Sequence, residues 1–166
     1  MGLFDVFKKR NAPASDSIMV VAPVSGEVVQ LCETDEPLFS SEALGKGVAI
    51  KPAENRIVAP CDGTVSLMFD TGHAVSLVSK SGAEILIHVG LETVSLKGKH
   101  YTVHVKNGDA IKAGQLLIEF DREAIAADGF DTITPVLVCN PENFSEMRTY
   151  PGKTVRAGEK IIGLKK

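Results

Sequence analysis

The chain has 166 residues, of which 44% are hydrophobic and 23% charged, a size and composition typical of one globular domain with a buried core. Its net charge of −3 and its aromatic content of 5% argue against nucleic-acid binding, because the chain offers little phosphate neutralisation or base stacking. The three cysteines, Cys32, Cys61 and Cys139, form no CxxC pair, which disfavours a disulfide framework and suits a reducing cytosol.

Residues 1–17 are expected to form a flexible amphipathic tail. Leu3, Phe4 and Phe7 would share one side of a helix, and Lys8–Arg10 follow them, a pattern typical of a weak anchor on an anionic membrane. A disordered tail is the alternative, because about ten residues form little helix alone in water. No apolar stretch reaches the ~20 residues that a membrane-spanning helix needs.

From Ile18 onward, short β-rich runs alternate with turn residues, which predicts a single domain over residues 18–166. The expected fold is all-β, an antiparallel β-sandwich or barrel-like structure with Greek-key and hairpin connections and one or two short helices. The predicted strands are Ile18–Ala22, Gly26–Gln30, Val48–Pro52, Arg56–Ala59, Gly63–Met68, Ala74–Val78, Glu84–Val89, His100–Val105, Leu116–Phe120, Thr132–Cys139 and Lys160–Leu164. The predicted helices are Pro37–Ala43 and Arg122–Ala127, the second with Asp121 as its N-cap.

Two pairs of segments repeat within the chain. VAPVSGEV (21–28) recurs as VAPCDGTV (58–65), and VKNGDAIKAGQLL (105–117) resembles TYPGKTVRAGEKII (149–162). Glycines at fixed offsets indicate repeated turns, so these echoes favour a duplicated β-hairpin scaffold without chemistry of its own.

The segment TGHAVSLVSKSGAEILIHVG (71–90) places two histidines in one predicted hairpin. If residues 80 and 81 are the centre of the turn, position 73 pairs with position 88, because paired positions in a hairpin have a constant sum. His73 and His88 would then be neighbours on adjacent strands, with Cβ atoms ~5 Å apart. His100 and His104, among several lysines, are interpreted as solvated surface residues.

Two neighbouring imidazoles in apolar surroundings suggest three kinds of site. They could bind a metal, although two ligands are too few for a closed zinc site. They could be a general acid–base pair, or a nucleophile beside a hydrogen-bond donor. A purely structural histidine pair is the fourth possibility, and pattern alone leaves all four open. Phosphate-loop, GxGxxG, HExxH and GxSxG motifs are missing, which disfavours nucleotide binding and the usual ester hydrolysis.

The sequence resembles the glucose-type enzyme IIA family of the bacterial phosphoenolpyruvate:sugar phosphotransferase system over essentially its whole length. The resemblance rests on VAPVSGEVV, on Phe39-Ser40 leading to GKGVAIKP, and on VAPCDGTV, FDTGHA, EILIHVGLETVSLKG and IEFD followed by TPV. A histidine in TGHA, fifteen residues before the histidine of EILIHVG, is the most specific of these features.

The resemblance implies a cytoplasmic, monomeric phosphocarrier, a transferase component that needs no cofactor. His88 would accept a phosphoryl group at Nε2 from the phosphorylated histidine of HPr and donate it to a cysteine of a glucose-family IIB domain of a sugar permease. His73 would assist the transfer, Thr71 would orient His73, and a backbone carbonyl such as that of Gly90 would hold Nδ1 of His88.

The resemblance also implies a docking surface and regulatory partners. The residues at its contact positions are Glu36, Leu38, Phe39, Leu44, Phe69, Leu86, Glu92 and Val94. The apolar ones would form a rim that excludes water during transfer, an interpretation favoured for Phe39 and Phe69, and plain core packing is the alternative. The unphosphorylated form would bind glycerol kinase and non-glucose sugar permeases, and the phosphorylated form would stimulate adenylate cyclase. His73 and His88 could share a zinc ion with a partner's carboxylate and a water.

The chain departs from the family pattern at several positions. An expected glycine is His100, followed by Tyr101 where the family has Phe, and Glu92 replaces an Asp. Leu86 stands where Phe is common, and Ala43 where the side chain is bulkier. Phosphoryl transfer is expected to survive these changes, whereas regulatory contacts are less secure.

Overall fold

The computed structural model describes residues 17–166, and every strand pairing in this part of the chain is antiparallel. The strands are β1 (Ser17–Val21), β2 (Gly26–Gln30), β3 (Lys46–Pro52), β4 (Arg56–Val58), β5 (Gly63–Met68), β6 (Ala74–Ser79), β7 (Glu84–His88), β8 (Tyr101–Val103), β9 (Ala110–Ile111), β10 (Leu116–Phe120), β11 (Thr134–Val138), β12 (Glu146–Thr149), β13 (Lys153–Val155) and β14 (Lys160–Lys165). The helices are α3 (Pro37–Ser40) and α4 (Arg122–Ala127), with short 3-10 turns at Leu31–Glu33, Thr93–Leu96 and Pro141–Asn143. The predicted all-β fold with short helices is confirmed.

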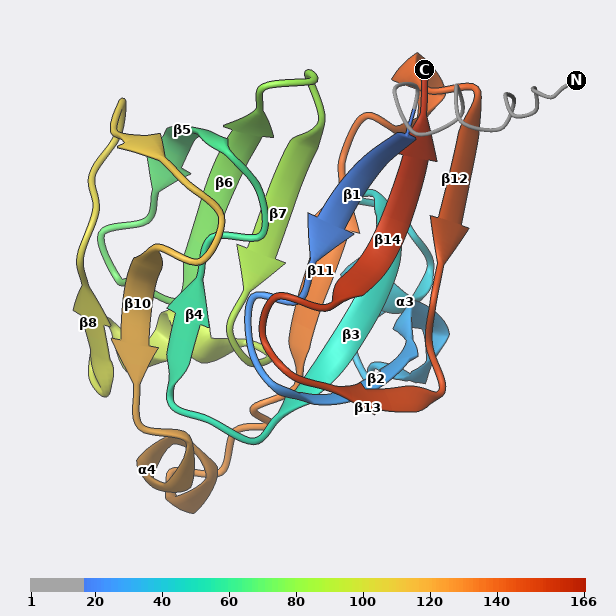
Figure 1. Cartoon of the computed structure of the whole chain (residues 1–166). Coiled ribbons are helices and arrows are strands. Elements are labelled where there is room, and N and C mark those ends of the chain that lie inside the picture. The colour runs from blue at the N-terminus through green and yellow to red at the C-terminus, as the bar shows by residue number, and fades with distance from the viewer. Residues whose placement is uncertain (1–16) are drawn as a thin grey trace, which may run out of the picture.

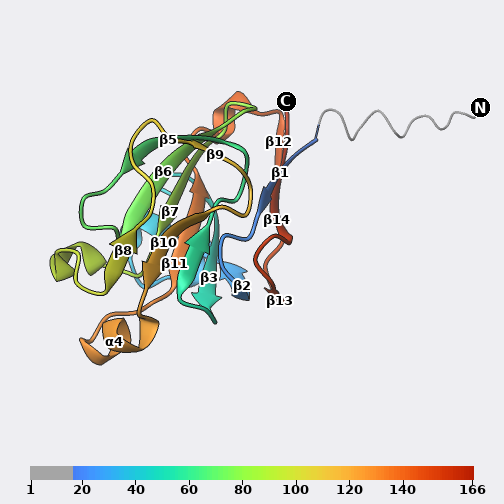
Figure 2. The same cartoon turned by 60° about the vertical axis from the view of Figure 1, so that its left-hand side comes forward.

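Three sheets form the sandwich. The largest has eight strands in the order β13-β2-β3-β11-β7-β6-β5-β9, and two three-stranded sheets have the orders β1-β14-β12 and β4-β10-β8. Figure 1 shows the two small sheets side by side in front of the large one, and Figure 2 shows the layers closer to edge-on. The main core fills the space between the layers, with Ile57 and Ile118 from one small sheet, Ile161 and Leu164 from the other, and Val48 from the large sheet.

A smaller apolar cluster covers the opposite face of the large sheet. It consists of Val29, Leu31, Phe39, Ala49, Leu91, Ile133 and Leu137, with Leu86 packed against it. Strand alternation explains the division, because Ile85 and Ile87 of β7 enter the main core while Leu86 points to the other face. His88 follows Leu86 by two residues and ends the strand on the side of the small cluster.

The internal echoes correspond to two equivalent packing units. Gly158 N–H donates to the carbonyl of Ala22 at 2.9 Å, and Gly114 N–H donates to that of Ala59 at 2.8 Å. A side-chain contact repeats as well, since Ser25 Oγ accepts from Ala157 N–H and Asp62 Oδ1 accepts from Ala113 N–H, both at 2.9 Å. The repeated sequences thus build the same turn-on-turn contact twice.

The two predicted helices differ in outcome. Helix α4 has the predicted bounds, and its N-cap Asp121 accepts from Ala124 N–H at 3.0 Å through Oδ1. Helix α3 ends at Ser40, three residues earlier than predicted, because Glu42 takes a left-handed φ of 63° that a helix cannot continue through.

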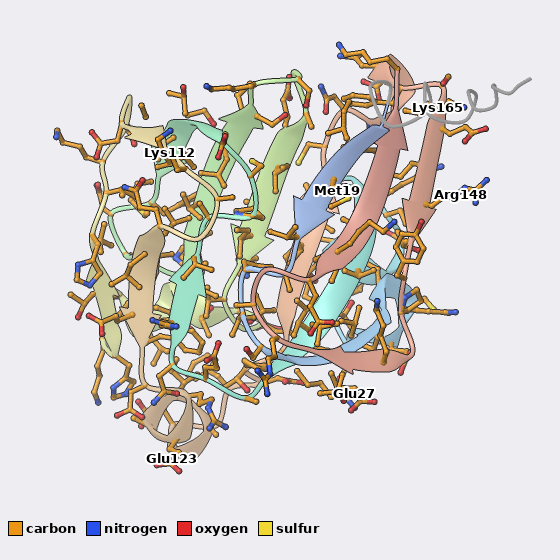
Figure 3. The ribbon with its side chains drawn as sticks, viewed as in Figure 1. Met19, Glu27, Lys112, Glu123, Arg148 and Lys165 are labelled. Carbon is orange, nitrogen blue, oxygen red and sulfur yellow. The ribbon has the colours of Figure 1, made fainter. Side chains whose placement is uncertain are left out.

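Charged side chains lie around the periphery of the sandwich, as Figure 3 shows for Lys112 near the top, Glu123 on α4 at the bottom and Arg148 on β12. No helix within residues 17–166 is long and apolar enough to cross a membrane. The predicted tail, residues 1–17, lies outside the described residues except for Ser17, which opens β1.

Candidate functional site

The two histidines of the predicted hairpin lie together at one end of the β6–β7 pair. β6 begins at Ala74 and β7 ends at His88, and these two residues are paired in the sheet. In Figure 1 this is the lower end of the pair, where the β7 arrowhead lies beside the start of β6. The ring centroids of His73 and His88 are 5.0 Å apart, and the ring planes make an angle of 76°.

The predicted pairing of position 73 with position 88 is wrong by one residue. The turn between the strands is a three-residue loop, in which Ser79 N–H donates to Ala83 O at 2.9 Å and Gly82 takes a φ of 92°. A loop of three residues, unlike the two-residue turn assumed from sequence, moves the partner of His88 to Ala74.

The rings still meet because His73 precedes the regular strand. Gly72 has a φ of 72°, which turns the chain just before His73. The carbonyl of His73 accepts from Val89 N–H at 2.6 Å, so the backbones of the two histidine segments remain joined beyond the end of β7. Because His73 lies before the first residue of β6, its side chain need not follow the alternation of faces along that strand.

A hydrogen bond at Nδ1 fixes the His88 ring and leaves Nε2 available to react. Its Nδ1 donates to the carbonyl of Gly90 at 2.6 Å, the contact expected from sequence. A carbonyl only accepts, so this bond places the proton on Nδ1 and leaves a lone pair on Nε2. The ring is half-buried and lies against Phe39, with centroids 5.1 Å apart.

Gly90 can hold this position only as glycine. Its φ is 88°, and a Cβ there would lie 2.6 Å from Cγ2 of Thr93. Both the left-handed backbone and the close approach exclude a side chain without local rearrangement.

His73 is buried more deeply than His88, at 4% exposure. Its Nδ1 is hydrogen-bonded to the hydroxyl of Thr71, and its ring lies against Phe69 with centroids 5.3 Å apart. The Thr71–His73 contact fixes the ring orientation, so the Nε2 side of His73 is the free one.

Both imidazoles are neutral at neutral pH. Burial, and then the nearby His88, lower the pKa of His73 from 6.5 to about 4. Burial also lowers the pKa of His88, while the hydrogen bond to Gly90 and the charge of Glu36 act in the opposite direction. A neutral His88 with a free Nε2 can act as a nucleophile.

The predicted contact residues divide into an exposed and a buried set. Leu38, Leu44 and Val94 are exposed at 53%, 40% and 54%. Phe39, in contrast, is only 3% exposed, so it forms a wall beside His88 instead of an open rim. Leu86 and Phe69 are half-buried.

The two predicted acidic residues occupy different settings. Glu36 is the N-cap of α3, where its carboxylate accepts from Leu38 N–H at 3.4 Å, and it lies close enough to affect His88 electrostatically. Glu92 is exposed and has a left-handed φ of 59°. Neither carboxylate forms an ion pair within the part of the chain that the structure describes.

Of His100 and His104, both interpreted as solvated surface residues, only His104 is exposed. His100 is half-buried, with its Nε2 2.8 Å from Asp128 Oδ2, and His104 Nε2 lies 2.7 Å from Glu119 Oε1. His100 takes a φ of 78°, the left-handed conformation that explains why a glycine is expected at this position.

Sequence reasoning missed the part played by Thr93 and Tyr101. Thr93 Oγ1 and the Tyr101 hydroxyl both donate to the carbonyl of Val89, at 2.8 and 2.7 Å, directly beside His88. From the sequence, Tyr101 is only a departure from the family pattern, because no rule of residue spacing predicts a contact between Tyr101 and residues 88–90.

Within the described range, no three or more histidine, cysteine, aspartate or glutamate side chains come together as a metal site. His73 and His88 alone give two ligands, fewer than zinc requires.

Comparison with known sequences adds a second line of evidence. The phosphoenolpyruvate-dependent sugar phosphotransferase system EIIA 1 family matches residues 18–144, which include both histidines. A glucose-specific EIIA component of Oceanobacillus iheyensis is 43% identical over 145 residues, covering 87% of this chain and 88% of that protein.

A longer relative and a solved structure agree with this match. A β-glucoside-specific EIIBCA component of Dickeya chrysanthemi is 46% identical over 134 residues, or 81% of this chain, and the match spans 21% of that longer protein. The solved glucose permease IIA of Mycoplasma capricolum superposes with a TM-score of 0.81 at 30% identity, covering 89% of this chain and 95% of that one.

Proposed function

Because the chain belongs to the phosphoenolpyruvate-dependent sugar phosphotransferase system EIIA 1 family, we propose that it is a phosphocarrier in which His88 accepts and donates the phosphoryl group. The donor is the phosphohistidine of HPr, and the acceptor is a cysteine of a glucose-family IIB domain. The observation that carries the proposal is the state of His88, a neutral ring whose Nδ1 is held by Gly90 and whose Nε2 is free.

In the accepting step, the Nε2 lone pair of His88 attacks phosphorus and a new N–P bond forms. The N–P bond of phospho-HPr breaks, and its electron pair stays with the imidazole of HPr. The His88 ring keeps its Nδ1 proton and gains positive charge, which the carbonyl of Gly90 stabilises through the hydrogen bond. In the donating step the cysteine thiolate of IIB attacks phosphorus, and His88 leaves as a neutral imidazole.

His73 has a supporting role in this mechanism. Its ring lies 5.0 Å from that of His88, and its low pKa keeps it neutral. If Thr71 donates its hydroxyl proton to Nδ1, the proton of His73 resides on Nε2, where it can donate to a phosphoryl oxygen. Phosphoryl transfer depends mainly on such alignment and charge stabilisation, and no metal step is needed in it.

The exposed apolar side chains beside the site suit a partner that excludes water during transfer. Leu38 and Val94 are more than half exposed, and the buried Phe39 forms part of the wall around His88. The fusion of related sequences to EIIB and EIIC parts, in relatives such as the Dickeya chrysanthemi protein, supports a IIB domain as one partner. The acidic Glu36 and Glu92 would complement a basic HPr surface.

A second candidate function is regulatory binding through the same surface. The unphosphorylated form would contact glycerol kinase or non-glucose permeases, the phosphorylated form would stimulate adenylate cyclase, and a phosphoryl dianion on His88 would change the charge presented to each. The exposed Leu38, Leu44 and Val94 favour this use because they offer apolar contact area in either state. Residues 17–166 supply no third zinc ligand beside His73 and His88, so we derive no zinc-dependent step.

Incubation with phosphoenolpyruvate, enzyme I and HPr, followed by intact mass, tests the phosphocarrier proposal. The protein should gain one phosphoryl group, and His88→Gln should gain none. His104→Gln, which removes an exposed histidine paired with Glu119, is the matched control and should be phosphorylated normally. Phosphorylation persisting in His88→Gln would overturn the assignment.

A further inference from the structure

Tyr101, the first residue of β8, contacts the backbone beside His88 through its hydroxyl. Its hydroxyl donates to the carbonyl of Val89 at 2.7 Å. Its side chain also packs against the turn before His73, because a Cβ placed on Gly72 would lie 3.0 Å from Tyr101 Cβ. Burial raises the pKa of Tyr101 to about 12, so the hydroxyl keeps its proton at physiological pH.

The peptide groups of Val89 connect the two histidines. The N–H of Val89 donates to the carbonyl of His73 at 2.6 Å. Its carbonyl belongs to the peptide plane that leads into Gly90, whose own carbonyl holds Nδ1 of His88. A donor that fixes the Val89 carbonyl therefore limits how far Gly90, and with it the His88 ring, can rotate.

We propose that Tyr101 is a positioning residue for phosphoryl transfer at His88. Its hydroxyl orients the Val89–Gly90 peptide, this peptide sets the place of the Gly90 carbonyl, and the Gly90 carbonyl keeps the proton of His88 on Nδ1. Nε2 is thereby presented as the nucleophile in a fixed direction. The inference rests on the proposed role of His88, and Tyr101 itself touches no reacting atom.

Thr93 shares this task. Its Oγ1 donates to the same carbonyl at 2.8 Å, so the two lone pairs of the Val89 oxygen are both used. Loss of one donor leaves the other in place, whereas loss of both leaves a buried carbonyl unsatisfied, a more costly state. The family pattern has Phe at position 101, so the second donor is an addition in this chain, and its removal should weaken transfer without abolishing it.

Tyr101→Phe tests the proposal, and Tyr150→Phe, the other tyrosine of the chain, is the matched control. The Tyr150 ring lies under Lys160, with Nζ 4.7 Å from its centroid, on the sheet β1-β14-β12. The rate of phosphoryl acceptance is measured over a range of phospho-HPr concentrations. Tyr101→Phe should lower kcat roughly 3- to 10-fold, the equivalent of one hydrogen bond. KM should stay unchanged because Tyr101 is not one of the residues proposed to contact HPr. The final extent of phosphorylation should equal that of the parent protein.

Nitrogen-15 NMR of the His88 ring gives a readout that a purely structural role would not change. The parent protein should show the Nδ1-protonated tautomer alone, and Tyr101→Phe should show a mixture of tautomers. In the double variant Thr93→Val/Tyr101→Phe, the shift in tautomer population should exceed the sum of the shifts in the two single variants. This measurement needs no phosphoryl donor, so it separates failure of the positioning role from failure of the phosphocarrier proposal. Values of kcat and tautomer population in Tyr101→Phe that match those of Tyr150→Phe would overturn the inference.

Discussion

The rings of His73 and His88 stand 5.0 Å apart at 76°, although the sheet pairs His88 with Ala74. The closeness of the two histidines therefore depends on the irregular backbone around Gly72 and Gly90, both with positive φ, and not on strand register. This arrangement lets one histidine be buried and the other remain half-exposed, which suits an assisting residue and a nucleophile.

His73→Gln should separate the two halves of the transfer cycle. His88 keeps its Gly90 contact in this variant and should still accept a phosphoryl group from phospho-HPr. Transfer to the IIB cysteine should fall by at least about tenfold, because the glutamine amide does not place its N–H where the imidazole Nε2–H of His73 would donate to a phosphoryl oxygen. Single-turnover transfer from the isolated phosphorylated protein to IIB measures this step, and normal donation by His73→Gln would contradict the assisting role.

Gly90→Ala should lower the free energy of unfolding by more than the cost of a left-handed alanine alone. Gly90 has a φ of 88°, and an added Cβ would lie 2.6 Å from Cγ2 of Thr93. We expect a loss of about 2–4 kcal/mol in the free energy of unfolding, from backbone strain and overpacking together, and slower phosphoryl acceptance. Urea unfolding and the acceptance rate measure the two effects.

Gly108→Ala is the matched control for this change. Gly108 has a φ of 89°, nearly that of Gly90, but no atom lies within 4 Å of the added Cβ. It should lose only about 1 kcal/mol, the cost of the left-handed conformation, and keep full acceptance. Equal losses in the two variants would show that contact with Thr93 is unimportant.

The all-β fold and the closeness of His73 and His88 could be predicted from the sequence. The strand register and the backbone turns that set the geometry of the two rings could not. Strand patterns gave the bounds of β2, β5 and β10 correctly, because alternation and flanking turn residues are local signals. The missed strands β9, β12 and β13 have two to four residues, too few for a period to show. The hairpin register failed because one residue more in a loop, which composition hardly reveals, changes every pairing.

The contribution of Tyr101 shows a different limit. Tyr101 and the Val89 carbonyl are twelve residues apart in sequence, and their contact depends on how the sheet β4-β10-β8 places Tyr101 against the residues that follow β7. A hydroxyl donor to a backbone carbonyl leaves no motif, so only the folded structure reveals it. The burial of Phe39 shows a similar limit, since the exposure of an apolar residue depends on what packs around it in the folded chain.

The free energy of unfolding should fall in mild acid because folding lowers the pKa of both His73 and His88. The pKa of His73 is lowered from 6.5 to about 4, and that of His88 is lowered as well, so the unfolded chain binds more protons below pH 6.5. The stabilisation is therefore complete above pH 6.5 and is lost as the pH falls towards about 4. For each histidine the loss is at most about 1.4 kcal/mol per pH unit.

Urea unfolding of the parent protein and of His73→Gln between pH 7 and pH 5 measures this effect. The free energy of unfolding should depend less on pH in His73→Gln, because glutamine does not titrate. The same slope in His73→Gln as in the parent would show that His73 is not a buried neutral group.

Val94→Ser should weaken docking without changing the chemistry. Val94 is 54% exposed and follows Thr93, whose hydroxyl is bonded to the backbone beside His88. A partner that covers His88 should also cover this side chain, and its loss should cost about 1 kcal/mol of binding, or a KM for phospho-HPr roughly five times higher. The value of kcat should stay the same, since no group that touches the phosphoryl group changes.

Val78→Ser is the control for this prediction. Val78 is 37% exposed but lies towards the opposite end of β6 from His73, so the change should leave both KM and kcat unaltered. An equal rise of KM in the two variants would place the docking surface elsewhere than beside His88.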